Sequence, residues 1–239
     1  MNSNQPNLLN RYSLEPLRKY PCIFAYWLPF IVCLIYLTVF TKTQGFVIIN
    51  HAHTAFFDIF FKALTFLGDG ISAIILVMFL ATINRKRLAG SLLISFLVSG
   101  LLSCIFKTFF HSPRPHSYFG TEGLVRSVPG VVVHGSNSFP SGHTITAFAL
   151  LGLLALAARH KWQTYLFFFI AWLIGYSRVY LGQHFPADVC AGSFVGTFTA
   201  VVCYNLHNNT IMWRRFKIAC RQFVKKSFLA NWPLVERFV

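Results

Sequence analysis

The stretch SRVYLGQHFPAD, residues 177–188, places a guanidinium, an imidazole and a carboxylate close together in the chain. His184 follows Arg178 by six positions, and Asp188 follows His184 by four. Residues four apart share one face of a helix if the helix runs through both of them. Pro186 suits a first helical turn, where its missing N–H costs nothing, and a long apolar run follows directly. The stretch therefore predicts a histidine held by an aspartate at the start of an apolar helix, with an arginine nearby.

The composition is that of an integral membrane protein. Of the 239 residues, 55% are hydrophobic and only 11% are charged, whereas soluble domains average about 25% charged residues. The net charge of +15 does not indicate a nucleic-acid partner, because the basic residues form short clusters between apolar runs, as in cytoplasmic loops. The six cysteines lie in or beside the apolar runs without zinc-site spacing, so we interpret them as small apolar side chains.

Six apolar segments predict an all-α, polytopic membrane protein with six transmembrane helices, in a single domain covering residues 1–239. A span needs about 20 apolar residues. The second segment is short and reaches that length only by including Leu64–Leu67. No cleavage site follows the first segment, so we expect an uncleaved span. The segments are Pro21–Phe40, Gly70–Ile83, Leu88–Phe110, Ser141–Ala158, Trp162–Tyr176 and Ala187–Leu206. The aromatic stretch FFDIFFKALTF, residues 56–66, predicts an amphipathic helix at the membrane interface.

The distribution of basic residues predicts that both termini are cytoplasmic. With six spans, 15 of the 21 Lys and Arg residues fall on the inner side, as the positive-inside rule requires. They include those of a cytoplasmic tail, residues 1–20, and of a basic C-terminal segment, residues 207–239. Within that segment, Ile211–Phe228 alternates apolar and basic stripes. It predicts either a helix on an anionic leaflet or a solvated basic tail.

Two further motifs lie at the ends of predicted spans, on the same outer face as the first stretch. KTFFHSPRP, residues 107–115, has a lysine, six intervening residues and then Arg-Pro. PSGH, residues 140–143, opens the fourth span. Three cations at a membrane surface indicate an anion, and phosphate suits arginine forks, a lysine and a helix N-terminus with a glycine. The converging residues are Lys107, Arg114, Ser141, Gly142, His143, Arg178, His184 and Asp188.

Together, K-x6-R-P, P-S-G-H and S-R-x5-H-x3-D resemble the signature of the type 2 phosphatidic acid phosphatase superfamily. That superfamily includes lipid phosphate phosphatases, polyprenyl-diphosphate phosphatases, lipid A phosphatases and vanadium haloperoxidases. Every fixed position is filled, in order and at the right spacing. The motifs cover residues 107–188, and the six-span layout extends the likeness to most of the chain.

The resemblance implies a role for each motif residue. His184 attacks phosphorus to form a phosphohistidine, and Asp188 fixes its tautomer and supports the developing positive charge. His143 protonates the leaving oxygen and then activates water. The phosphate-binding residues are Lys107, Arg114, Ser141, Gly142 and Arg178. Such a reaction needs positioning and charge stabilisation above all.

We expect no metal and no other cofactor. Only Asp58, Asp69 and Glu122 accompany Asp188 on the predicted outer face, which leaves no carboxylate cluster for magnesium. His51 and His53 are two residues apart and do not share a helix face, so a metal pair is not expected. Asp69, between two glycines, predicts a turn before the second span. For three further histidines of the outer loop we expect no assigned role: His111, His116 and His134.

The sequence thus predicts a metal-independent phosphatase acting on a membrane lipid mono- or diphosphate. Lipid A, undecaprenyl diphosphate and a glycerolipid phosphate remain open as substrates, and oligomeric state is not predicted. Small size and short termini favour a bacterial inner membrane with a periplasm-facing site. Two alternatives remain: a phosphotransferase that passes the phosphoryl group to another lipid, and a non-catalytic lipid-binding or transport protein. The catalytic histidines argue against the latter, and a haloperoxidase is disfavoured because those relatives are soluble.

Overall fold

The computed structural model describes residues 23–120, 122–132, 134–211, 213–215, 218, 219 and 222. The predicted cytoplasmic tail, residues 1–20, lies outside these residues. So does most of the basic C-terminal segment, including the greater part of its predicted surface helix.

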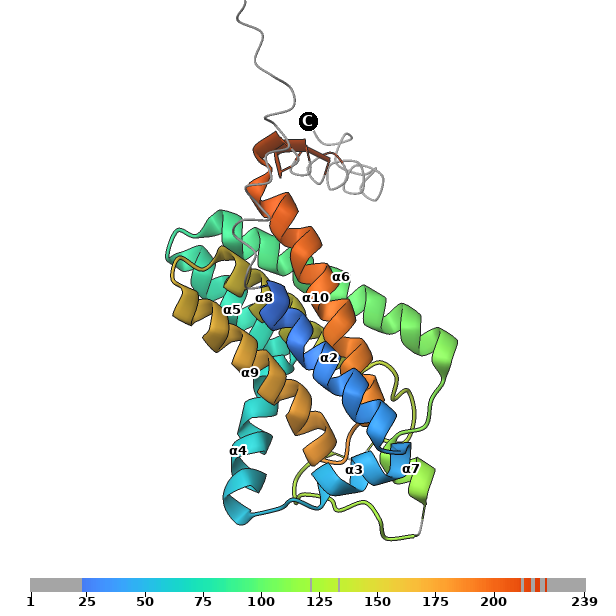
Figure 1. The fold of residues 1–239 in the computed structure, drawn as a ribbon. Coiled ribbons are helices and arrows are strands. Elements are labelled where there is room, and N and C mark those ends of the chain that lie inside the picture. The colour runs from blue at the N-terminus through green and yellow to red at the C-terminus, as the bar shows by residue number, and fades with distance from the viewer. Residues whose placement is uncertain are drawn as a thin grey trace, which may run out of the picture.

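Helix α8, Gly142–Ala157, is the centre of a helical bundle (Figure 1). It packs against α10, Pro186–Asn208, against α9, Lys161–Tyr180, and against α6, Lys86–Phe110. Ten of its 16 residues are buried, as expected of a helix that is apolar on all sides and enclosed by others. The first turn of α8 is therefore fixed by three neighbouring helices.

Two glycines of α10 allow it to lie close to α8. A methyl group added at Gly196 would lie 2.5 Å from the carbonyl oxygen of Ile145. One added at Gly192 would lie 2.9 Å from the carbonyl oxygen of Ser141. Small residues of this kind let transmembrane helices approach closely, and here they hold the start of α10 against the start of α8.

The remaining helices surround this centre. Helix α2, Ile23–Val39, lies along α10, and its part from Phe30 to Val39 makes a 115° bend with α3, Lys42–Asn50. Helix α4, Ala55–Thr65, packs on α9. The 3-10 turn η2, Phe66–Gly68, joins α4 to α5, Gly70–Thr82.

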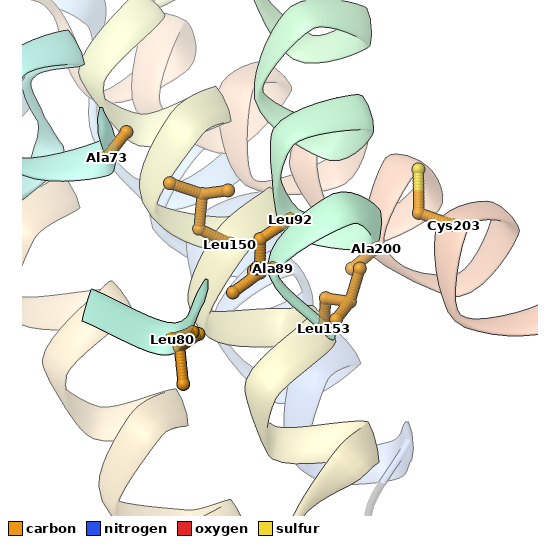
Figure 2. Close-up of a cluster of buried hydrophobic side chains, with 8 residues drawn as sticks. All are labelled: Ala73, Leu80, Ala89, Leu92, Leu150, Leu153, Ala200 and Cys203. Atoms are coloured by element: carbon orange, nitrogen blue, oxygen red, sulfur yellow. The ribbon is translucent and has the colours of Figure 1, made fainter. Parts of the chain in front are cut away.

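Helix α5 closes a core of small and branched side chains against α6, α8 and α10 (Figure 2). Asp69 caps its start by accepting a hydrogen bond from the N–H of Gly70 at 2.6 Å, so the predicted turn is present. The core residues are Ala73, Leu80, Ala89, Leu92, Leu150, Leu153, Ala200 and Cys203.

All six apolar segments are helical within the described residues, and no described residue forms a strand. In the part of the chain that the structure describes, two stretches are long and apolar enough to cross a membrane by themselves, Lys86–Phe119 and Pro186–Asn208. Two bent helix pairs raise that number to four if each pair is one span. The second predicted span belongs to one of them, because α4 and η2 meet α5 at 60°. Helix α9 also extends one turn beyond its predicted end.

Candidate active site

His184 lies in the five-residue connection between α9 and α10, outside both helices. The connection turns back on the end of α9, since the N–H groups of Gln183 and His184 both donate to the carbonyl oxygen of Arg178, at 2.9 and 3.2 Å. Gly182 has a φ of +70° there, which favours glycine. His184 is thereby buried, with 1% of the residue's surface exposed.

The pairing of His184 with Asp188 does not depend on a continuous helix. Pro186 is the first residue of α10, as predicted, so His184 precedes the helix and the two residues do not share a helix face. Instead, Asp188 Oδ2 accepts the N–H of Phe185 at 2.9 Å and caps α10. The cap turns the carboxylate back toward the preceding connection.

Asp188 Oδ2 serves two further groups. The hydroxyl of Ser138 donates to it at 2.5 Å, and Nδ1 of His184 lies 3.4 Å away. The same Nδ1 also lies 3.4 Å from Ser138 Oγ. A proton on Nδ1 is therefore shared between two oxygens, and Nε2 is left as the nitrogen with a free lone pair.

Two arginines near this pair are held in place by hydrogen bonds. The Arg178 side chain is 6% exposed and donates from Nη1 to Thr65 Oγ1 at 2.7 Å, while its buried Nε has no partner among the described residues. Arg114 donates from Nε to the carbonyl of Ser136 at 3.0 Å and from Nη1 to Gln183 Oε1 at 3.2 Å. Both guanidinium groups keep donors free for a further acceptor.

The start of α8 faces the same place. The backbone N–H of Ser141 donates to the carbonyl of Asp188 at 3.1 Å. This N–H group is therefore already used, and those of Gly142 and His143 remain as donors at the predicted helix N-terminus. A methyl group at Gly142 would lie 3.2 Å from Ser103 Oγ and 3.6 Å from Lys107 Nζ, which places the lysine beside the helix start.

His143 occupies the first turn of α8 on the side of η2. A methyl group at Gly68 would lie 3.2 Å from its Cβ atom. His143 interacts electrostatically with Arg178, His184, Lys107 and Arg114. All eight motif residues thus gather at one end of the bundle, where α6 and α9 end and α8 and α10 begin.

The charges of the site are unbalanced. Burial lowers the pKa of His184 to about 4, assisted by Arg178 and Arg114 and opposed by Asp188, so the imidazole is neutral near pH 7. Burial also lowers the pKa of the exposed loop residue His134, and the positive charges of Arg114, Arg178 and Lys107 add to this shift. Three cations and one carboxylate favour a bound anion, and the forked guanidinium groups match phosphate oxygens.

A second polar cluster, which we call the Asp58 cluster, lies near the end of α9. Asp58 binds Nδ1 of His53 at 2.7 Å, the Tyr180 hydroxyl at 2.6 Å and Nη2 of Arg126 at 3.3 Å. His51 is bonded elsewhere, to the carbonyl of Leu124. Among the described residues, no group of three or more His, Cys, Asp or Glu side chains is arranged to hold a metal ion.

Sequence reasoning missed three polar residues that hold the site: Thr65, Ser138 and Gln183. Thr65 binds Arg178 across 113 positions, and Gln183 binds Arg114 across 69 positions. Such separations leave no periodic signal in the sequence. Ser138 lies two residues before PSGH, and this proximity was the one available indication.

The apolar helices are those of an integral membrane protein, and one end of the bundle gathers three cations around a buried histidine–aspartate pair. The family model of the PAP2 superfamily matches residues 88–212, more than half of the chain, and the chain belongs to this superfamily.

Several relatives are similar to this chain over part or most of its length. "Undecaprenyl-diphosphatase" of Sulfolobus acidocaldarius is 28% identical over 204 residues, 80% of this chain and 94% of that protein. "Lipid A 4'-phosphatase" of Porphyromonas gingivalis is 31% identical over 50% of this chain and 51% of its own length. "Bacitracin transport permease protein BcrC" of Bacillus licheniformis is 30% identical over 52% and 57%. The chain thus spans little more than half the length of the Porphyromonas gingivalis and Bacillus licheniformis proteins.

Two crystal structures have similar folds. LpxE of Aquifex aeolicus aligns with a TM-score of 0.60 and 32% identity, over 67% of this chain and 92% of that one. The PAP2-type phosphatidylglycerolphosphate phosphatase of Bacillus subtilis aligns with a TM-score of 0.59 and 21% identity, over 81% and 96%. The second likeness concerns the fold alone.

Proposed function

We propose that the chain is a lipid phosphatase that removes a phosphate from a membrane lipid mono- or diphosphate through a phosphohistidine intermediate. The observation that carries the proposal is the buried pair His184–Asp188 within reach of three cations and of a second histidine, His143. A binding site for phosphate needs the cations alone. The neutral, oriented imidazole is what a nucleophile requires.

The proposed reaction has two steps. Nε2 of His184 attacks phosphorus, and the bond from phosphorus to the lipid oxygen breaks while that oxygen takes a proton from His143. Water then attacks the phosphohistidine and gives its proton to His143, and the N–P bond breaks to release phosphate. Asp188 accepts a hydrogen bond from the Nδ1–H group, which stays protonated, and supports the positive charge of the ring.

The phosphate oxygens would be bound by the remaining motif residues. Arg178 and Arg114 offer guanidinium donors that are not already used, and Lys107 adds a point charge beside Gly142. The N–H groups of Gly142 and His143 would add helix N-terminal donors. Electrostatic stabilisation of this kind supplies most of the catalysis in phosphoryl transfer.

A groove beside the site supports a lipid as the substrate. It has a volume of about 420 Å³ and is lined by η2, α5, α8 and α9. Its α8 lining residues, Ala147, Leu150, Leu151 and Leu154, follow His143 by four, seven, eight and eleven positions. This spacing puts them on one helix face with the proposed proton donor. A lipid leaving group that accepts a proton from His143 would find an apolar path along that face.

The proposal includes the orientation of the protein. We infer six spans formed by α2, the bent α4–α5 pair, α6, α8, α9 and α10, because the positive-inside rule then puts 15 of 21 basic residues on the cytoplasmic side. The site would face away from the cytoplasm, in a bacterial inner membrane toward the periplasm. The relatives named as lipid A and undecaprenyl-diphosphate phosphatases support lipids of these classes as candidate substrates.

The test is phosphate release by detergent-purified protein from four lipids: undecaprenyl diphosphate, lipid A, phosphatidylglycerol phosphate and phosphatidic acid. His184→Ala is the blank. We expect release from at least one lipid, inhibition by vanadate and no inhibition by a chelator. Rapid quenching in base should trap phosphate on His184.

Each contrary result has a distinct meaning. Release that is equal in His184→Ala removes this residue as the nucleophile, and loss of activity with chelator contradicts the metal-independent mechanism. Release that requires an added acceptor lipid indicates a phosphotransferase. Lipid binding without turnover would instead favour a binding or transport protein, in keeping with the name of the Bacillus licheniformis relative.

A further inference from the structure

Ser138 is a fully buried serine that touches both members of the His184–Asp188 pair. Its backbone N–H donates to the carbonyl of Ser112 at 2.9 Å. Ser112 precedes Arg114 by two positions, so this bond holds Ser138 against the segment that carries Arg114. The Ser138 hydroxyl donates to Asp188 Oδ2, with 2.5 Å between the two oxygens. This is the shortest contact that Oδ2 makes with a described residue. The contact of the same oxygen with His184 is the longest, at 3.4 Å.

We propose that Ser138 is a positioning residue that competes with His184 for Asp188 and thereby limits the lifetime of the phosphohistidine. The inference rests on the mechanism proposed above. In the resting site, Ser138 holds Oδ2, and the Nδ1 proton of His184 is divided between two oxygens at 3.4 Å. Long contacts of this kind are weak hydrogen bonds.

The competition matters because the charge of His184 changes during the reaction. When Nε2 forms its bond to phosphorus, the imidazole becomes positive and its Nδ1–H becomes a stronger donor to Asp188. An aspartate without the Ser138 donor would bind that proton more tightly. The phosphohistidine would then be more stable, and the N–P bond would break more slowly when water attacks. Ser138 therefore favours the second step of the reaction at the expense of the intermediate.

The test compares the phosphoenzyme in wild-type protein and in Ser138→Ala, with phosphatidic acid or whichever lipid of the panel turns over best. We expect kcat to fall about tenfold, the size of one hydrogen bond to a charged group. The fraction of protein trapped as phosphoenzyme at steady state should be small in the wild type and should be most of the protein in Ser138→Ala. Single-turnover phosphorylation should be no slower than in the wild type.

Two further variants separate positioning from packing. Ser138→Cys keeps a side chain of similar size but replaces the hydroxyl with a weak donor, so it should also accumulate phosphoenzyme and serves if Ser138→Ala does not fold. Ser193→Ala is the matched control. Ser193 is a buried serine of α10 whose hydroxyl donates only to the helix carbonyl of Cys190, at 2.7 Å, and this variant should behave as wild type.

The inference is overturned if both Ser138 variants lose turnover without accumulating phosphoenzyme, because a merely structural role would have that effect. It is also overturned if both retain wild-type kcat and phosphoenzyme level. Failure of the proposed function looks different: no phosphoenzyme would be trapped on His184 in the wild-type protein itself.

Discussion

Two histidine–aspartate pairs lie at the same end of this bundle, and they differ in how their charges are balanced. In the Asp58 cluster, one carboxylate meets His53 at 2.7 Å, the Tyr180 hydroxyl at 2.6 Å and Arg126 at 3.3 Å. In the other pair, His184 lies 3.4 Å from Asp188 and near Arg178 and Arg114, which form no ion pair with a carboxylate among the described residues. In the first arrangement both carboxylate oxygens are bonded and join segments of the fold, although the buried Nε2 of His53 has no partner among the described residues. The second leaves binding capacity for an anion, so the surroundings of His184, more than its pairing with an aspartate, support it as the proposed nucleophile.

The largest expected difference between the two pairs is in their response to the same substitution. Asp188→Asn should lower kcat by about 10³- to 10⁴-fold, because an amide can hold the imidazole in the wrong tautomer. Asp58→Asn should leave kcat within about threefold but lower the stability by about 1–2 kcal/mol, since Arg126 and His53 lose a charged partner. Phosphate release and thermal unfolding in detergent measure the two effects. A large loss of kcat in Asp58→Asn would place the Asp58 cluster in the reaction.

The two regions also contain arginines in contrasting surroundings. Arg178→Lys should lower kcat/KM about 100-fold, because the side chain is 6% exposed and a lysine keeps the charge without the planar fork. Arg126→Lys should have no measurable effect on turnover, since that side chain is 46% exposed and its charge can still pair with Asp58. Steady-state kinetics on both variants checks this. Equal losses would mean that the second arginine also contacts substrate.

The pH dependence sharpens the comparison further. Burial lowers the pKa of His184 to about 4, so the neutral nucleophile predominates above about pH 5 and is lost as the pH falls through 4. We expect kcat/KM to fall about tenfold per pH unit below that value. His53→Gln should not move this acidic limb. A limb near the ordinary histidine value of about 6.5 would show that His184 is protonated in the free enzyme at mildly acid pH.

The smallest expected effect on kcat/KM comes from replacing a glycine at the site, compared with the same replacement of a glycine away from it. Gly142→Ala should lower kcat/KM about tenfold, because the new methyl group meets Ser103 Oγ at 3.2 Å and lies near Lys107. Gly100→Ala, in α6, places its methyl group in open space and should leave activity unchanged. Both variants add the same atom to a helix, so a common change in activity would exclude displacement of Lys107 as the cause.

The sequence predicted the helices because apolar length and helix-start residues are local signals. Pro186 and Asp69 mark helix starts as expected. The predicted end of α9, Tyr176, is four residues short because Ser177 and Arg178 interrupt the apolar run. The helix continues through these two polar residues to Tyr180, and both of them are buried. The predicted histidine held by an aspartate at a helix start is present, but a helix cap, and not a shared helix face, produces the contact across four residues.

The motif residues could be gathered at one end from topology alone, but their supporting contacts could not. Ser138, Gln183 and Thr65 each bind a partner that is distant in the chain. Those contacts depend on how α6, α8 and α9 pack together, so they cannot be predicted from a single sequence without its fold.

The hydrogen bond from the Ser141 N–H to the Asp188 carbonyl has a consequence for how this chain could diversify. It ties the helix that carries His143 to the helix that positions His184 through main-chain atoms alone. Side chains can therefore be exchanged around the two histidines without altering the spacing between them. Under the proposed function, the groove along α5 and the loops beside the site can vary to fit new lipids while the proposed reactive centre stays unchanged. A library that varies the groove residues should thus yield altered lipid preference much more often than altered chemistry.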